Sequence, residues 1–281
     1  MSNIKFKGET VHLVGRKIEV GKQASPAYVV TNDLREIDIL ELKGRIKLIT
    51  TFPSLDTPVC DLQVKEFNKK AVDFSDEVIV LGISKDLPFA QKRFCESFSI
   101  DRVILLSDYK SSSFGINYGF LIKELGLLAR GVMILDKNDF IRYIQIVEEL
   151  TLPPDYNDAL SNLEKVIKSP YLDTKKDLPT KCKPCEEGIP PLTKETIDKL
   201  IAQYNGWQLI DDKKLVKEFI FKDFKEAKYF LDLIAIISEE QKHHPHISLI
   251  YNKLKLTLTT HASGGLTEND LILAKIIDEL T

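Results

Sequence analysis

The chain has 281 residues, of which 43% are hydrophobic, and this length and composition are typical of a globular protein with two domains. Its 39 basic and 42 acidic residues give a formal net charge of −3, which excludes a general basic surface for nucleic acid. The N-terminal residues lack the apolar core of a signal peptide, and no apolar run reaches membrane-spanning length. We therefore expect a cytoplasmic protein that binds neither nucleic acid nor a membrane. There, the four cysteines indicate transient redox chemistry, metal binding or inert buried thiols rather than structural disulfides.

Apolar runs separated by glycine, proline and polar residues predict alternating strands and helices in the first part of the chain. Strands are expected at residues 10–14, 27–31, 46–52, 78–84, 103–107, 132–135 and 140–147. The first two should frame the start of a sheet. Helices are expected downstream of residue 57 and at residues 88–98 and 156–167. This alternation predicts a layered α/β domain over residues 1–168.

Cys60 lies where the buried strand at residues 46–52 gives way to a helix. The helix is indicated by apolar residues that recur at roughly helical spacing, namely Val59, Leu62, Val64, Phe67 and Ala71. Cys60 should therefore occupy the first helical turn, where unpaired backbone N–H groups and the helix dipole favour a thiolate over a thiol. A thiolate at this position is a nucleophile.

The segment around Cys60 has the pattern P-x-x-x-T-x-x-C, formed by Pro53, Thr57 and Cys60, and it resembles the active site of peroxiredoxins. The sequences PSLDT at residues 53–57, DLPFAQKRFC at 86–95 and LSD at 106–108 are most similar to the bacterial thiol peroxidases, a subfamily of atypical 2-Cys peroxiredoxins. The similarity extends from about residue 8 to residue 159. It implies a thioredoxin-like fold, usually homodimeric, that reduces hydrogen peroxide and organic hydroperoxides without metal or flavin.

The resemblance also implies a role for five residues. Cys60 is expected to be the peroxidatic thiolate that becomes a sulfenic acid, and Cys95 the resolving thiol that forms a disulfide with it. Thr57 is expected to hydrogen-bond the thiolate and the peroxide, Pro53 to screen the sulfenate, and Arg130 to supply positive charge. Three of these residues have a structural alternative: Cys95 as a core thiol, Thr57 as a plain N-cap and Arg130 as a surface charge.

Formation of that disulfide predicts local unfolding. Thiols on separate helices seldom reach the roughly 5.5 Å Cα separation of a disulfide without movement. The resemblance further implies that thioredoxin is the reductant that regenerates the enzyme.

A polar, lysine-rich stretch predicts a linker at residues 169–180, followed by a second domain at residues 181–281. That domain should contain a helix opening at Thr193, a hairpin formed by residues 207–210 and 215–221, and a helix capped by Asp223 that ends before Pro245. A half-buried strand at residues 254–260 and a final helix opening at Thr267 follow. The order α-β-β-α-β-β-α predicts a small α+β domain.

Four of the five histidines fall in this second domain, at His243, His244, His246 and His261. Solvent exposure at a helix end is one explanation for the cluster. The pattern also resembles the signature of pterin-4a-carbinolamine dehydratases at Glu239, His243, His244, Pro245, Tyr251, His261 and Asp270. Trp207 and residues 219–224 and 264–270 extend a similarity that covers roughly residues 182–280. His246 lies outside the signature and is expected at the surface.

This second resemblance implies removal of water from a 4a-hydroxytetrahydropterin to give a quinonoid dihydropterin. The departing hydroxyl needs an acid and the ring proton needs a base, and imidazoles serve both purposes near neutral pH. The expected catalytic residues are His243, His244 and His261. The residues expected to bind the substrate or orient the histidines are Glu239, Asp270, Trp207 and Pro245. As alternatives, the domain is an idle dehydratase-like module for dimerisation or interaction, and Asp270 is only part of the capping box Thr267-x-x-Asp270.

Cys182 and Cys185 form a C-x-x-C pair that offers a tethered dithiol for the disulfide of the first domain. We do not favour this, because no strand precedes the pair and similar segments head lone dehydratase domains. Zinc bound by this pair and the histidines is also disfavoured, since the spacing matches no zinc finger. We therefore expect no bound metal or cofactor, with thioredoxin as an external reductant and a pterin as a substrate.

Overall fold

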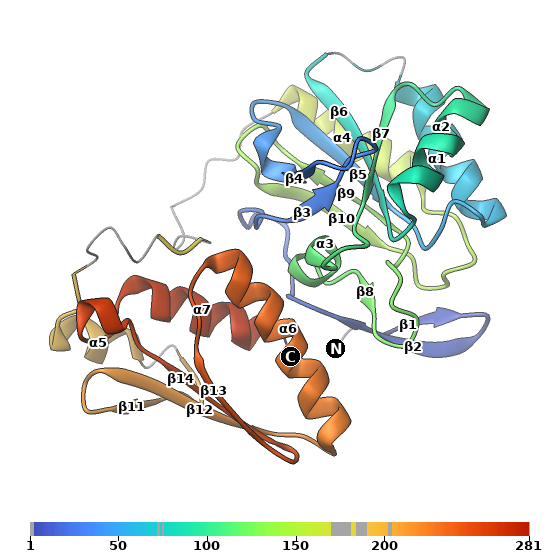
Figure 1. The fold of residues 1–281 in the computed structure, drawn as a ribbon. Helices are drawn as coiled ribbons and strands as arrows, with labels where there is room; N and C mark the ends of the chain where they lie inside the picture. The colour runs from blue at the N-terminus through green and yellow to red at the C-terminus, as the bar shows by residue number, and fades with distance from the viewer. Residues whose placement is uncertain are drawn as a thin grey trace. The chain divides into compact units, whose positions relative to one another are not determined.

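The computed structural model describes residues 3–71, 74, 76–169, 181–183, 190–201 and 204–280. The chain divides into two units by its internal contacts, Met1–Asp177 and Leu178–Thr281 (Figure 1). Apart from Ser169, the predicted linker at residues 169–180 lies outside the described residues. In the part of the chain that the structure describes, every helix is too short or too polar to cross a membrane.

A seven-stranded mixed sheet forms the centre of the first unit, with strand order β10-β9-β5-β6-β7-β3-β4 (Figure 1). Its strands are β3 (Tyr28–Val30), β4 (Glu36–Asp38), β5 (Ile46–Thr51), β6 (Val78–Ser84), β7 (Val103–Ser107), β9 (Gly131–Leu135) and β10 (Ile141–Ile146). The three central strands β5, β6 and β7 are parallel, and the flanking strands join them antiparallel. Parallel central strands are covered on both faces, which explains why β5 and β6 are buried along their whole length.

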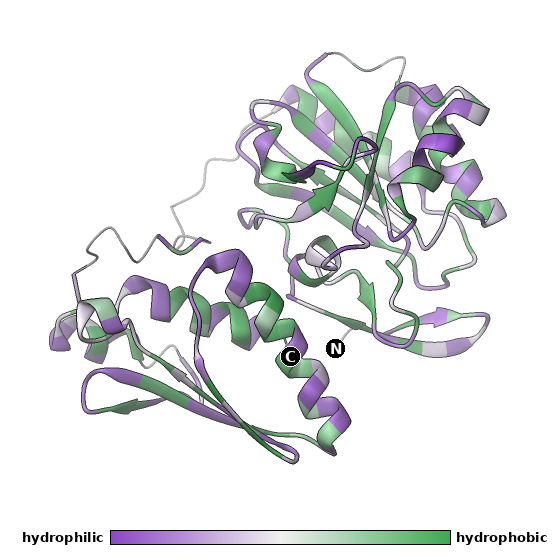
Figure 2. Ribbon diagram, viewed as in Figure 1, coloured by the Kyte–Doolittle hydropathy of each residue, from purple (hydrophilic) through white to green (hydrophobic). Residues whose placement is uncertain are grey.

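The alternation of side chains along these strands divides the core of the first unit into two clusters. In β6, Val78 and Val80 join a cluster with helices α1 (Pro58–Lys70), α2 (Pro88–Phe98) and α4 (Tyr156–Lys168). Ile79 and Leu81 join a second cluster on the other face, which includes residues of the short helix α3 (Ser113–Asn117). The 3₁₀ helix η1 (Ile39–Glu41) follows β4. Figure 2 shows the apolar character of the central strands between these layers.

One prediction about the sheet was wrong. Residues 10–14 and 27–31 do not frame one sheet, because β2 (Glu9–Val14) pairs with β1 (Asn3–Phe6) and β8 (Leu121–Ile122) in a separate three-stranded sheet, whereas β3 belongs to the main sheet. The sequence did not reveal β8 because a two-residue strand has no periodicity of its own. The predicted apolar face of α1 was also partly wrong: Leu62 is exposed, and the buried face is formed by Cys60, Gln63, Val64 and Phe67.

The second unit contains a four-stranded antiparallel sheet of order β11-β12-β14-β13 (Figure 1). Its elements are α5 (Lys194–Ile201), β11 (Gln208–Ile210), β12 (Lys214–Ile220), α6 (Phe224–Gln241), β13 (His246–Ile250), β14 (Lys253–Leu258), η4 (His261–Ser263) and α7 (Glu268–Glu279). Strand β14 alternates between buried Leu254 and Leu256 and exposed Lys253 and Lys255, as its sequence predicted. Helix α6 contacts both β14 and α7, so one face of this sheet carries the core.

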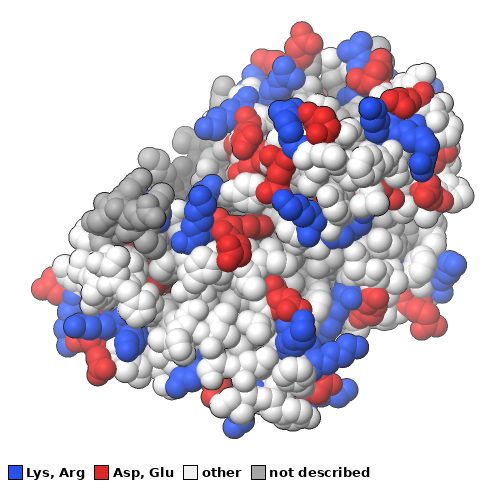
Figure 3. Space-filling model, viewed as in Figure 1, with Lys and Arg blue, Asp and Glu red and all other residues white. Residues whose placement is uncertain are grey.

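Charged side chains are mixed over the surface drawn in Figure 3, where Lys and Arg lie between Asp and Glu. This pattern matches the small net charge of the sequence.

Candidate active sites

The position of Cys60 follows from the way in which α1 begins. Buried Phe52 and Pro53 follow β5, and Pro58 then starts the helix, where the missing proline N–H costs no hydrogen bond. Thr57 is the N-cap residue, with an extended backbone (φ −110°, ψ 141°). Cys60 is consequently the third helical residue, and its side chain is fully buried.

Two donors lie beside the sulfur of Cys60. Thr57 Oγ1 is 2.7 Å from Cys60 Sγ, and Arg130 Nη2 is 3.3 Å from it. Thr57 occupies the N-cap position, yet its hydroxyl makes no capping bond to the helix and lies beside the thiol instead. A hydroxyl and a guanidinium that both donate to sulfur stabilise a thiolate. Thr57 and Arg130 thus lie at the thiol, as predicted.

Arg130 is almost completely buried, at 2% exposure, so the alternative of a surface charge is wrong. Its three nitrogens have separate acceptors. Nη2 contacts Cys60, Nη1 donates to Gln63 Oε1 at 2.5 Å, and Nε donates to the carbonyl oxygen of Leu150 at 3.1 Å. The guanidinium is therefore fixed in its plane as well as in position.

Gln63 is a site residue that the sequence reasoning missed. Its side chain is fully buried one turn after Cys60, and its amide nitrogen donates to Thr50 Oγ1 at 2.6 Å and to the carbonyl of Thr51 at 3.1 Å. The same carboxamide accepts from Arg130, so it holds the guanidinium against strand β5. The available signal was a polar residue three positions after the cysteine, on the face of the helix that carries the thiol.

Cys95 lies in the later part of α2 and is half-buried. It packs against the apolar cluster that contains Cys60, and both thiols are free in this structure. Burial raises the pKa of Cys95 above its ordinary value, and nearby Glu96 adds to the shift. Cys95 is thus mainly protonated at neutral pH.

Tyr156, the first residue of α4, is a further neighbour of this site that the sequence reasoning did not identify. Its ring meets that of Phe67 edge-on, with 5.5 Å between the centroids. Burial raises the pKa of Tyr156, and the Arg130 guanidinium partly opposes that shift. The phenol therefore remains neutral beside the guanidinium.

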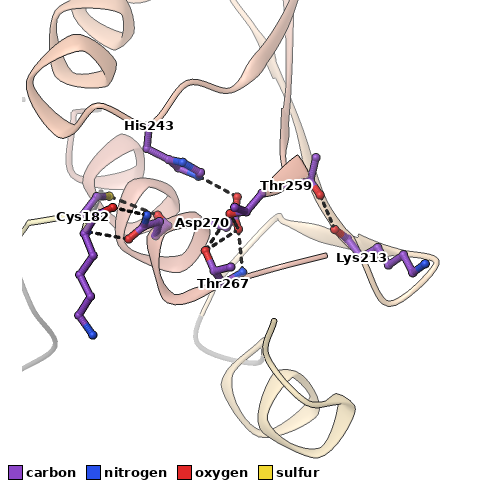
Figure 4. Close-up of polar contacts among 9 residues, drawn as sticks. Cys182, Lys213, His243, Thr259, Thr267 and Asp270 are labelled. Carbon is purple, nitrogen blue, oxygen red and sulfur yellow. Dashed lines mark hydrogen bonds and ion pairs between the residues drawn. The ribbon is translucent and has the colours of Figure 1, made fainter. Parts of the chain in front are cut away.

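In the second unit, His243 and Asp270 form a buried pair. Their side chains are 5% and 0% exposed, and His243 Nε2 lies 2.9 Å from Asp270 Oδ1 (Figure 4). The other carboxylate oxygen, Oδ2, accepts from Thr260 Oγ1 and from the backbone N–H of Thr267, each at 2.8 Å. Asp270 therefore caps α7 and holds His243 at once, one oxygen for each role.

His244 faces solvent beside its own carboxylate partner. Helix α6 ends at Gln241, and Lys242 adopts a left-handed conformation (φ 51°) that turns the chain before His243. His243 is buried as a result, whereas the next residue is exposed, and His244 Nε2 lies 3.0 Å from Glu239 Oε1. Pro245, also buried, then leads into β13. The two adjacent histidines thus have opposite environments.

The two remaining predicted residues lie on other elements. His261 is exposed at the start of η4, directly after Thr260, which binds Asp270. Trp207 is buried, and its indole nitrogen donates to both carboxylate oxygens of Asp278 at 3.0 and 3.1 Å. It precedes β11, which forms the opposite edge of the sheet from β13, the strand that follows the histidine pair. The structure therefore links His261 to the His243 pair through Thr260 and attaches Trp207 to Asp278.

Cys182 is buried next to this histidine site, whereas Cys185 lies outside the described residues. The backbone N–H of Cys182 donates to Gln241 Oε1 at 2.8 Å, and its thiol lies 3.6 Å from the carbonyl of Asn269 (Figure 4). The side-chain amide of Asn269 also pairs with both backbone groups of Lys183, at 2.9 and 2.8 Å. Among the described residues, no three His, Cys, Asp or Glu side chains are grouped to hold a metal ion.

The first unit has a buried cysteine at a helix start beside a mixed sheet, and a threonine and an arginine contact its sulfur. This arrangement defines the first unit as a peroxidase that works through a thiol. Residues 19–165 match the family model described as Redoxin, and residues 190–280 match the one described as Pterin 4 alpha carbinolamine dehydratase. The chain belongs to the redoxin family, with a pterin-4a-carbinolamine dehydratase domain fused at its C-terminal side.

Relatives of the first unit are peroxidases. The chain is 44% identical over 165 residues to a thiol peroxidase of Oceanobacillus iheyensis, a match that covers 59% of this chain and 100% of that protein. It is 46% identical over 166 residues to a thiol peroxidase of Staphylococcus aureus, again covering 59% of this chain and all of the other. A crystal structure of a peroxiredoxin-like protein from Aquifex aeolicus is 41% identical and covers 58% of this chain and 96% of that one, with a TM-score of 0.55. These matches confirm the predicted thioredoxin-like first domain.

Proposed function

We propose that this chain is a bifunctional enzyme, in which the first unit reduces hydrogen peroxide and organic hydroperoxides and the second dehydrates 4a-hydroxytetrahydropterins. The observation that carries the first activity is the position of Cys60 Sγ between Thr57 Oγ1 and Arg130 Nη2. The observation that carries the second is the pair of adjacent histidines, each with its own carboxylate.

The first step of the peroxidase reaction is attack by the Cys60 thiolate on a peroxide oxygen. An S–O bond forms and the O–O bond breaks, so that Cys60 becomes a sulfenic acid and the other oxygen leaves as an alkoxide or hydroxide that takes up a proton. The Arg130 guanidinium stabilises the negative charge that develops on the leaving oxygen, and Thr57 orients the sulfur and the peroxide. Buried Pro53 screens the sulfenate.

Resolution follows when the Cys95 thiolate attacks the sulfur of the Cys60 sulfenic acid. An S–S bond forms and hydroxide leaves as water after protonation. The two helices must loosen to bring the thiols together, and we propose that thioredoxin then reduces the disulfide. The active form is proposed to be a homodimer or a higher homo-oligomer.

The dehydratase reaction assigns different tasks to the histidines. The hydroxyl at C4a leaves as water after protonation, and a ring proton passes to a base. His244, exposed and paired with Glu239, and His261, exposed on η4, are accessible to a pterin. His243 is held by Asp270 and acts from the buried side. Trp207 and Pro245 are proposed to contact the pterin.

One set of assays on the full-length protein tests both activities. Wild type should consume hydrogen peroxide with thioredoxin, thioredoxin reductase and NADPH, and Cys60→Ser should not. Wild type should also dehydrate synthetic carbinolamine faster than His244→Ala does. A Cys60→Ser variant with full peroxidase activity would refute the first proposal. Equal dehydration by wild type and His244→Ala would leave the second domain as a dimerisation or interaction module.

A further inference from the structure

Asp86 lies in the turn between β6 and α2 and contacts the loop that leads to Cys60. Its Oδ1 accepts a hydrogen bond from Ser54 Oγ at 2.7 Å. Its Oδ2 accepts from the backbone N–H of Leu55 at 2.8 Å and from Ser84 Oγ at 2.8 Å. The carboxylate is half-buried, and two of its three donors belong to the segment between β5 and α1.

These contacts continue to the sulfur of Cys60. The carbonyl oxygen of Ser54 lies 3.2 Å from both the backbone nitrogen and the hydroxyl oxygen of Thr57. Thr57 Oγ1 in turn lies 2.7 Å from Cys60 Sγ. The position of the hydroxyl that supports the thiolate therefore depends on Ser54, which Asp86 holds.

Asp86 is also built into the start of the helix that carries Cys95. It immediately precedes Leu87, the N-cap of α2, and its carbonyl oxygen accepts from Ser107 Oγ at 2.5 Å. One turn before Cys95, the amide nitrogen of Gln91 donates to the carbonyl of Leu106 at 2.9 Å and lies 3.2 Å from Ser84 Oγ, the hydroxyl that also binds Asp86. The base of α2 is thus attached to β6 and β7.

We propose that Asp86 is a positioning residue that fastens the Cys60 loop to the base of the Cys95 helix in the reduced enzyme. Its bonds to Ser54 and Leu55 must break before the Cys95 thiolate can attack the Cys60 sulfenic acid and release water. The inference rests on the proposed peroxidase function and adds that Asp86 sets the relative rates of its two steps, oxidation of Cys60 and formation of the disulfide. Asp86 favours the peroxide reaction and restrains the disulfide reaction.

Loss of this carboxylate should change the two steps in opposite directions. In Asp86→Ala, the loop no longer holds Thr57 against the sulfur, so oxidation of Cys60 by peroxide becomes slower. The same loss frees the loop from α2, so the sulfenic acid converts to the disulfide faster. Loss of a residue that only stabilised the fold would also loosen the helices and lower the thermal midpoint, but it would not slow the oxidation of Cys60. Hydrogen bonds to a charged group correspond to changes of roughly tenfold or more.

The test is a rapid-quench experiment on the full-length protein with hydrogen peroxide. N-ethylmaleimide traps the remaining thiols, dimedone traps the sulfenic acid, and mass spectrometry counts each form of Cys60 and Cys95 over time. Asp86→Ala should oxidise Cys60 roughly tenfold more slowly and form the disulfide roughly tenfold faster than wild type. Ser54→Ala, which removes one of the three donors, should shift both rates in the same directions by less. Asp101→Ala, which removes an exposed carboxylate after α2, should match wild type.

Disulfide formation that is equal to or slower than wild type in Asp86→Ala would overturn the proposal, as would a fall of both rates together with a lower thermal midpoint. If Asp86→Ala does not fold, Ser54→Ala decides alone, and unchanged disulfide formation in that variant would also overturn it. Failure of the proposed peroxidase function looks different: wild type itself would form neither a Cys60 sulfenic acid nor a disulfide with Cys95.

Discussion

The guanidinium of Arg130 shows how one side chain serves both structure and chemistry. Its contacts with Gln63 and Leu150 satisfy two of its nitrogens inside the protein, and the third nitrogen faces the Cys60 sulfur. A buried charge is tolerated only where such partners surround it. The partners also prevent the guanidinium from turning away when a peroxide binds, so the positive charge is in place before the reaction starts.

Arg130→Lys should lower the second-order rate constant for hydrogen peroxide by roughly 10²-fold, because an ammonium group cannot reach all three acceptors. Competition for peroxide with a reference peroxidase measures this constant. Arg16→Lys is the matched control, since Arg16 is also buried and donates to Ser25 Oγ at 2.6 Å outside the thiol site. A similar loss of rate in both variants would show that the effect is general damage to the core.

The rate of disulfide formation should depend on pH through the thiol of Cys95. Burial raises the pKa of Cys95, and only its thiolate attacks the sulfenic acid, so the rate of disulfide formation should increase as the pH rises from about 7 to about 9. Single-turnover rapid-quench experiments across this range measure that rate separately from the oxidation of Cys60. A disulfide rate that is constant or falls with pH would contradict the assignment of Cys95 as the attacking thiol.

At the scale of elements, local sequence signals predicted where helices begin. Apolar spacing downstream of residue 57 predicted α1, and the helix predicted at residues 88–98 is α2. Both helices begin with a proline, which is favoured in the first helical turn. These local signals did not predict tertiary contacts. The apolar residue Leu62 was expected to face the core, but the buried position went to Gln63, whose partners Thr50 and Arg130 are 13 and 67 residues away in the chain.

The histidine site shows the same division between local and distant information. The turn before Pro245 was predictable, since the residue before a proline disfavours helix. Sequence also offered two roles for Asp270, as a helix cap and as a histidine partner. The structure shows both, because each carboxylate oxygen has its own donors. Trp207 was expected near the pterin, and no local pattern revealed its bond to Asp278, 71 residues later.

The end of α6 allows a stability prediction. Lys242 holds a left-handed conformation that disfavours residues with a Cβ, so Lys242→Gly should stabilise the second unit by ~0.5–1 kcal/mol after the added freedom of the unfolded chain is subtracted. Denaturant unfolding followed by tryptophan fluorescence reports on this unit, because Trp207 is the single tryptophan of the sequence. Lys222→Gly, at a position without positive φ, should not raise the midpoint. A lower midpoint for Lys242→Gly would contradict the prediction.

For the whole molecule, each unit contains its own set of site residues, with Cys60, Cys95 and Arg130 in the first and the histidines in the second. Cys60→Ser should therefore abolish peroxide reduction and leave carbinolamine dehydration within about twofold of wild type, since additivity holds for independent sites. His244→Ala should have the reverse effect. The rates of peroxide reduction and carbinolamine dehydration should be measured for both variants at equal protein concentration. Loss of dehydration in Cys60→Ser would show that the two sites are coupled.

The side chain of Asn269 imitates a neighbouring strand, because its amide meets the N–H and C=O of Lys183 as a backbone would. These hydrogen bonds, together with the bond from Cys182 to Gln241, hold the beginning of the second unit against α6 and α7. A protein engineer who cuts the chain just before residue 181 keeps that attachment intact.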